Sequence, residues 1–157
     1  MDKTSWGPGP WSGEIDKEQF SDEATGLPCL IKRNQMGALC GYVGVSEGHP
    51  WFGVDHSEID ETAEVHGGLT FAGSCQEGGE AETICHIPGP GEPDHVWWAG
   101  FDCSHAWDVV PAMTALSLDM QDWPGVSYKT VAYVKAKCAG LAAQAAAAVH
   151  APVTGSG

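Results

Sequence analysis

Residues 127–149 carry their apolar side chains three or four positions apart, which is the spacing of one face of an α-helix. The apolar positions are Tyr128, Val131, Val134, Cys138, Leu141 and Ala145. Lysines occupy the other face, and the alanine-rich second half favours a helix by propensity. A helix with one apolar stripe needs an apolar surface to cover, and a sheet is the only large one that the rest of the chain can supply.

The sequence before this helix predicts that sheet. With 21 glycines and 10 prolines in 157 residues, the chain is richer in turn formers than a helical bundle. Two apolar runs at 27–31 and 38–45, separated by a polar turn at 34–37, predict a β-hairpin. A third strand is expected at about 65–72 and a fourth at about 95–103. We therefore predict an α+β fold in which the C-terminal helix packs on one face of an antiparallel sheet.

A short helix is expected directly after the strand that contains WWAGFDC. Asp108 followed by Pro111 is typical of a helix start, with the carboxylate as cap and proline in the first turn. This helix should reach about residue 118. The length of the chain predicts one globular domain over 1–150, and the sequence APVTGSG at 151–157 predicts a disordered tail.

The charge is strongly negative, with 21 acidic residues against 7 basic ones and a formal net charge of -14. Every lysine and arginine lies at or before Arg33 or at or after Lys129, so the middle of the chain has no basic residue other than histidine. Nucleic acids and anionic lipid surfaces are repelled by such a chain. We therefore expect no direct nucleic-acid binding and no membrane partner.

The first twenty residues lack the apolar core of a signal peptide, and no run approaches the roughly 20 apolar residues of a membrane span. We expect a cytoplasmic protein, in the host cytoplasm if a phage encodes it. In a reducing compartment its six cysteines are more often free thiols or metal ligands than disulfides.

The candidate chemistry gathers around VWWAGFDCSHAWD at 96–108, where an apolar strand ends in groups that titrate or bind metals. Thiolate and imidazole are the ligands that zinc prefers, so Cys103 and His105 predict a metal site. His66, His86 or Cys85 would complete its shell. The spacing lacks the C-x-x-C pair of common structural zinc sites, so a metal-free cluster stays open.

Two other chemistries fit the same residues. A cysteine with a nearby histidine and carboxylate is the arrangement of thiol hydrolases, and Cys103, His66 or His105, and Asp108 supply these types. The alternative is a noncatalytic site, in which tryptophans hold the ligand while His105 and Asp108 brace the loop.

Several stretches together resemble a family of small, mostly uncharacterised proteins found in phages, prophages and bacteria. The resemblance rests on TGLPCLIKRNQMGALCGYVGV, GHPWFG, VHGGLTFAGSC, ICHIPGPGEPDHVWWAGFDCSHAWD and YKTVAYVKAKC, and it covers about residues 6–141. It implies a phage-type intracellular context without an assigned reaction. The resemblance also implies that five residues here belong to the motifs of this family: His66, His86, Cys103, His105 and Asp108. Trp107 stands where that motif has a small residue.

We expect the site where the end of the fourth strand meets the turn after His66, with Gly67 and Gly68 allowing close approach of a ligand. The ligand-binding candidates are Trp98, Trp107, Gly67, Gly68 and Asp102, the catalytic candidates are Asp108, His105 and His66, and the metal candidates are Cys103, His105, His66, His86 and Cys85. The expected function is metal-assisted hydrolysis of a small molecule, with zinc as the candidate metal. A thiol hydrolase and a ligand-binding or sequestering protein that antagonises host defence are the alternatives, the latter by analogy with other phage proteins.

Overall fold

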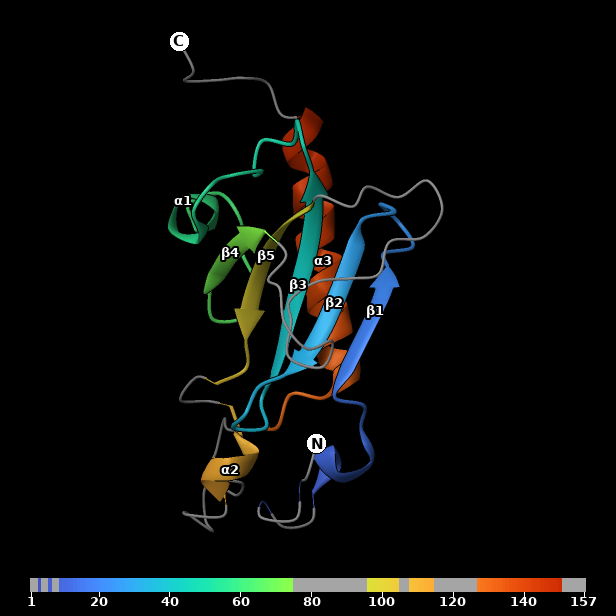
Figure 1. The fold of residues 1–157 in the computed structure, drawn as a ribbon, viewed down its shortest axis with the longest axis vertical. Helices are drawn as coiled ribbons and strands as arrows, with labels where there is room; N and C mark the ends of the chain where they lie inside the picture. Colours follow the sequence, from blue (N-terminus) through green and yellow to red (C-terminus); the bar gives the residue numbers. More distant parts are fainter. Residues whose placement is uncertain are drawn as a thin grey trace.

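The computed structural model describes residues 3, 6, 9–74, 96–104, 108–114 and 127–150. Five strands form one sheet in the order β1-β2-β3-β5-β4, with every neighbouring pair antiparallel (Figure 1). The strands are β1 Lys17–Ser21, β2 Pro28–Arg33, β3 Leu39–Ser46, β4 Phe71–Ser74 and β5 Val96–Asp102. The helices are the short 3-10 helix η2 Pro10–Gly13, α1 His56–Asp60, α2 Pro111–Thr114 and α3 Val131–His150. The fold is therefore α+β, as the sequence predicts.

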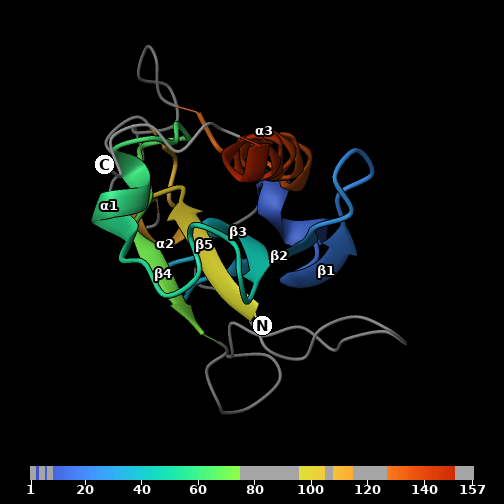
Figure 2. The same cartoon turned by 90° about the horizontal axis from the view of Figure 1, so that it is seen from above.

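Helix α3 lies across one face of the sheet, over β2 and β3 (Figure 2). Its stripe residues Val134, Cys138 and Leu141 are fully buried, which confirms the predicted amphipathic face. Gly41 in β3 makes the close contact possible, because a Cβ there would lie 2.6 Å from the Phe101 ring and 2.8 Å from the Cys138 sulfur. No helix in the described ranges combines the length and apolarity needed to cross a membrane.

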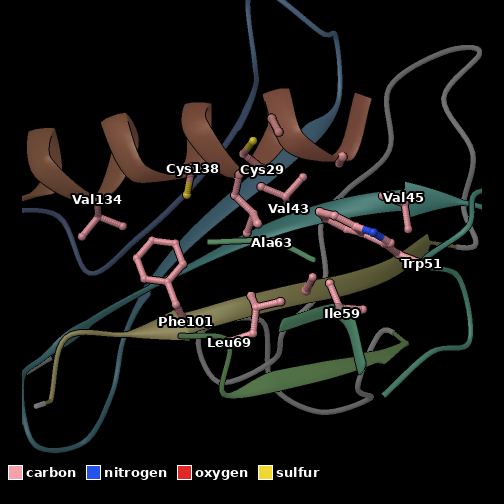
Figure 3. Close-up of a cluster of buried hydrophobic side chains, with 14 of the residues drawn as sticks. Cys29, Val43, Val45, Trp51, Ile59, Ala63, Leu69, Phe101, Val134 and Cys138 are labelled. Atoms are coloured by element: carbon pink, nitrogen blue, oxygen red, sulfur yellow. The ribbon is translucent and has the colours of Figure 1, made fainter. Parts of the chain in front are cut away.

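The same face of the sheet is completed by the chain between β3 and β4. Ile59 of α1, with Trp51 and Leu69 from the flanking loops, belongs to the same buried cluster as Phe101 of β5 (Figure 3). This segment covers the part of the sheet face that α3 does not cover. The main core therefore lies between the sheet and a layer formed by α3 and the β3–β4 segment. The other face has its own smaller cluster around Leu30, Cys40, Tyr42, Val96 and Trp98.

A buried arginine ties the beginning of the chain to the start of α3. The guanidinium of Arg33, 1% exposed, donates to Asp16 Oδ1 at 2.8 Å and to the Tyr128 hydroxyl at 2.8 Å. Glu14 accepts from the Tyr128 hydroxyl and, at 2.9 Å, from the backbone N–H of Val131. The first turn of α3 is thus held by side chains from more than 100 residues earlier.

The structure corrects three details of the sequence prediction. The third strand begins at Phe71 rather than near residue 65, because Gly67 and Gly68 have φ angles of 66° and 86° and turn the chain. The edge strand β1 and helix α1 were not predicted, since their short runs of mixed polar residues have no clear period. Asp108 does not cap α2, which begins three residues later; residues 115–118 and 151–157 lie outside the described ranges.

Two neighbouring positions in α3 test how the helix packs. Leu141→Ala should lower the free energy of unfolding by about 2–5 kcal/mol, because Leu141 is fully buried against the sheet. Gly140→Ala should raise it by about 0.5–1 kcal/mol, because Gly140 is exposed and a Cβ there meets nothing within 4 Å. Urea unfolding followed by circular dichroism measures both. A neutral Leu141→Ala would contradict the packing of α3 on the sheet.

Candidate metal centre

Three segments bring a histidine, a cysteine and an aspartate together at one end of the sheet. His66 lies before the glycine turn, Cys103 directly follows β5, and Asp108 precedes α2. One ligand atom of each lies within 4.8 Å of the others. All three side chains are shielded from water, with His66 5%, Asp108 0% and Cys103 2% exposed. This cluster could hold a metal ion.

Backbone hydrogen bonds fix the three segments relative to the sheet. The N–H of Thr70 donates to the Gly100 carbonyl at 2.9 Å, which holds the chain after His66 against β5. The N–H of Cys103 donates to the Leu39 carbonyl at 3.0 Å and extends the β3–β5 pairing by one residue. Cys103 therefore continues the alternation of β5 and faces the same side as Phe101, toward α3.

The carboxylate of Asp108 has a cation on one side and an imidazole on the other. Both of its oxygens lie 2.9 Å from Nε2 of His66, and Nζ of Lys129 lies 3.1 Å from Oδ1. The same ammonium donates to the carbonyl and the hydroxyl of Ser127 at 3.0 and 2.7 Å. An isolated parallel β-bridge pairs Asp108 with Ser127, so the carboxylate and the residues around Lys129 lie on adjacent stretches of backbone. The buried negative charge is thereby neutralised and hydrogen-bonded, as burial of an ion requires.

Tyr133, from the first turn of α3, contacts the opposite edge of the imidazole. Its hydroxyl lies 2.7 Å from Nδ1 of His66, and the two rings meet edge to face with centroids 5.3 Å apart. Burial raises the pKa of Tyr133, and the nearby Cys103 and Asp108 raise it further. The phenol therefore keeps its proton at neutral pH. His66 is held between two oxygen groups, one on each ring nitrogen.

The thiol of Cys103 is in a setting that disfavours the thiolate. Burial raises its pKa above the ordinary value, and the charge of Asp108 raises it further. Reactive cysteines have the opposite setting, with partial exposure and positive surroundings. A bound divalent metal would reverse this preference, because coordination to the cation stabilises the thiolate. The cluster therefore suits metal ligation better than unassisted nucleophilic attack.

Of the other predicted site residues, two lie next to the cluster and two lie on the opposite face of the sheet. Gly67 and Gly68 form the turn beside His66, and Asp60 anchors this turn by accepting from the Leu69 N–H at 2.9 Å. Trp98 is fully buried on the opposite face of the sheet, because it alternates with Phe101 and Cys103 along β5. Asp102 faces that side too, so neither residue joins the cluster. His105, Trp107, His86 and Cys85 lie outside the described ranges.

Sequence reasoning missed the roles of Lys129 and Tyr133. It placed Lys129 on the polar face of a helix over 127–149, whereas α3 begins at Val131 and Lys129 is buried just before it. One signal for Lys129 was available: it is the first basic residue after the long stretch that has none, and a buried aspartate needs a cation. Tyr133 carries no such signal, because its role depends on the angle at which α3 crosses the sheet.

No family model, no curated protein and no solved structure matches this chain. The function therefore has to be inferred from the geometry of the site.

The buried charges give a stability prediction. Asp108→Ala and Lys129→Met should each lower the free energy of unfolding by about 3–5 kcal/mol, because each leaves its partner buried without its opposite charge. The double variant should lose less than the sum of the two. Lys135→Met is the control: its ion pair with Glu18 is half-exposed and should contribute at most about 1 kcal/mol. Strictly additive losses in urea unfolding would contradict the pairing of Asp108 with Lys129.

The setting of Cys103 gives a reactivity prediction. Its raised pKa and its burial both reduce the amount of accessible thiolate, so iodoacetamide should alkylate Cys103 at pH 7 far more slowly than the same cysteine in the unfolded chain. Peptide mass mapping after timed quenching measures this rate in native and denatured protein. Fast alkylation of Cys103 in the native protein would favour the thiol-hydrolase hypothesis instead.

Proposed function

We propose that this protein is a metal-dependent hydrolase of a small molecule, with zinc held by His66, Cys103 and Asp108. The observation that carries the proposal is the convergence of three ligand atoms within 4.8 Å from three separate segments. Nitrogen, sulfur and oxygen donors of these kinds are the ligands of protein zinc. Three protein ligands are typical of catalytic zinc, which keeps a further position for water or substrate.

The surroundings of the three ligands support a metal. Tyr133 contacts the ring nitrogen of His66 that faces away from Asp108, and Lys129 contacts Asp108. Ligands of catalytic metals are oriented by such outer hydrogen bonds. The ion would supply Lewis acidity, which polarises a carbonyl or phosphoryl group and activates water.

The chain's own residues then have separate tasks. Cys103 and Asp108 would balance the two charges of the ion, which leaves the ammonium of Lys129 as an additional positive charge in a buried site. A fixed positive charge favours a reaction in which negative charge develops on a substrate oxygen. We assign Asp108, a catalytic candidate from the sequence, to the metal shell, because one of its oxygens lies within 4.8 Å of the ligand atoms of His66 and Cys103.

The second candidate is a noncatalytic ligand-binding or sequestering protein. It is favoured by one observation: Asp108, His66 and Lys129 already compensate one another without a metal. In that case the cluster braces the loop, and a ligand is held elsewhere. Metal content separates the two candidates.

Zinc binding is measured on protein purified without a histidine tag, by elemental analysis and by competition with a chromophoric chelator. We expect one zinc per chain, and a loss of affinity of at least about 100-fold in Cys103→Ser and in His66→Gln. Cys40→Ala, on the other face of the sheet, and His56→Gln, at an exposed position, are matched controls that should keep the affinity. Less than about a tenth of a metal per chain, unchanged on loading, would exclude the metal site.

The pH dependence of binding tests Cys103 as a ligand. Its thiol has a raised pKa and must lose its proton to bind zinc, so the apparent affinity should rise roughly tenfold per pH unit around neutrality. Cys103→Ser should remove this slope.

Catalysis is tested separately from binding. Zinc-loaded protein is assayed with p-nitrophenyl acetate and bis(p-nitrophenyl) phosphate, with His66→Gln as the control. His105→Gln, His86→Gln and Cys85→Ser are also loaded with zinc. If one of them loses the metal, four protein ligands close the shell and the site is structural rather than catalytic.

A further inference from the structure

The two ring nitrogens of His66 have partners of different chemistry. Nε2 faces both oxygens of Asp108 at 2.9 Å, and Nδ1 faces the hydroxyl of Tyr133 at 2.7 Å. Because Lys129 neutralises the carboxylate at 3.1 Å, Asp108 is held as an anion and can only accept hydrogen bonds. An imidazole with a single ring proton must therefore carry it on Nε2 in the metal-free protein. Nδ1 then accepts from Tyr133.

The distance between Nε2 of His66 and the oxygens of Asp108 is close to the distance between two ligands of one metal ion. Zinc bonds of about 2.0–2.1 Å at the tetrahedral angle place a nitrogen and an oxygen ligand roughly 3.3 Å apart. The observed separation of 2.9 Å between Nε2 and the carboxylate oxygens needs to widen by only a few tenths of an ångström. A metal on this side of the ring takes the place of the Nε2 proton.

We propose that the metal binds His66 through Nε2 and that Tyr133 is a positioning residue whose hydroxyl reverses from hydrogen-bond donor to acceptor when the metal enters. This inference rests on the proposed metal site. The imidazole loses a proton at Nε2 and gains one at Nδ1, so it stays neutral. The thiol of Cys103 gives up the single proton that is released to solvent. Tyr133 keeps its own proton throughout.

Tyr133 is suited to this part because a hydroxyl both donates and accepts. In the metal-free protein it donates to Nδ1, and in the loaded protein it accepts from Nδ1–H. Its ring stands nearly perpendicular to the imidazole, at 87°, so the ring plane of His66 is held while the proton position changes. A carbonyl or a carboxylate in its place could serve only one of the two states.

Long-range ¹H–¹⁵N correlation spectra of the full chain test the inference, because they report which nitrogen of each histidine carries the proton. We expect the Nε2–H form of His66 without metal and the Nδ1–H form with zinc bound. An Nδ1–H form without metal, or no change on loading with one equivalent of zinc, would overturn the inference. Zinc that fails to bind at all would instead overturn the proposed function.

Substitution gives a second readout. Tyr133→Phe keeps the half-buried ring and removes the hydroxyl, so it should weaken zinc binding by about 10–100-fold. The metal-free variant should keep the Nε2–H form of His66, because Asp108 still accepts from Nε2. Tyr42→Phe, which removes a hydroxyl on the opposite face of the sheet, is the matched control and should change neither the zinc affinity nor the tautomer. Unchanged zinc affinity in a folded Tyr133→Phe would contradict the role of Tyr133.

Discussion

A carboxylate buried as completely as that of Asp108 needs partners that offset the loss of its hydration. Lys129 supplies the charge, and His66 supplies a hydrogen bond from another part of the chain. Each partner belongs to a different segment. By pairing with both, Asp108 holds the glycine turn and the start of α3 next to the residues that follow β5. The candidate metal centre exists because these segments meet there.

The buried Arg33 also fixes the position of α3, through contacts at the N-terminal end of the helix. Arg33 and Glu14 both bind the hydroxyl of Tyr128, and Glu14 also binds the first N–H of the helix. Lys129 and Tyr133 lie within one turn of these contacts. The network around Arg33 therefore sets where the ammonium and the phenol stand relative to His66, although no atom of Arg33 takes part in the site.

Sequence reasoning was most successful where a period or a turn signal extended over many residues. The stripe of α3, the β2–β3 hairpin and the strand that ends at Asp102 are all long, regular and bounded by glycine or polar turns. The error in the third strand came from Gly67 and Gly68, whose positive φ angles stop a run of otherwise strand-like residues. Short elements such as α1 and β1 depend on tertiary contacts, which no local pattern encodes.

Sequence reasoning could nominate His66, Cys103 and Asp108 because strand ends and glycine turns often meet at a sheet edge. It could not separate them from Trp98 and Asp102, since the face on which a side chain lies depends on register, and one residue along a strand reverses it. Nor could it find Tyr133, whose contact with His66 spans 67 residues and depends on how α3 crosses the sheet.

The bond between Glu14 and the N–H of Val131 joins residues 117 positions apart. During synthesis, the strands up to β5 can pair before α3 leaves the ribosome, but Lys129 and Tyr133 cannot reach His66 until it does. Asp108 would meanwhile lack its cation. The centre can thus assemble only after residues 129–133 have been made, and a nascent chain carries His66, Cys103 and Asp108 well before it can bring them into one site.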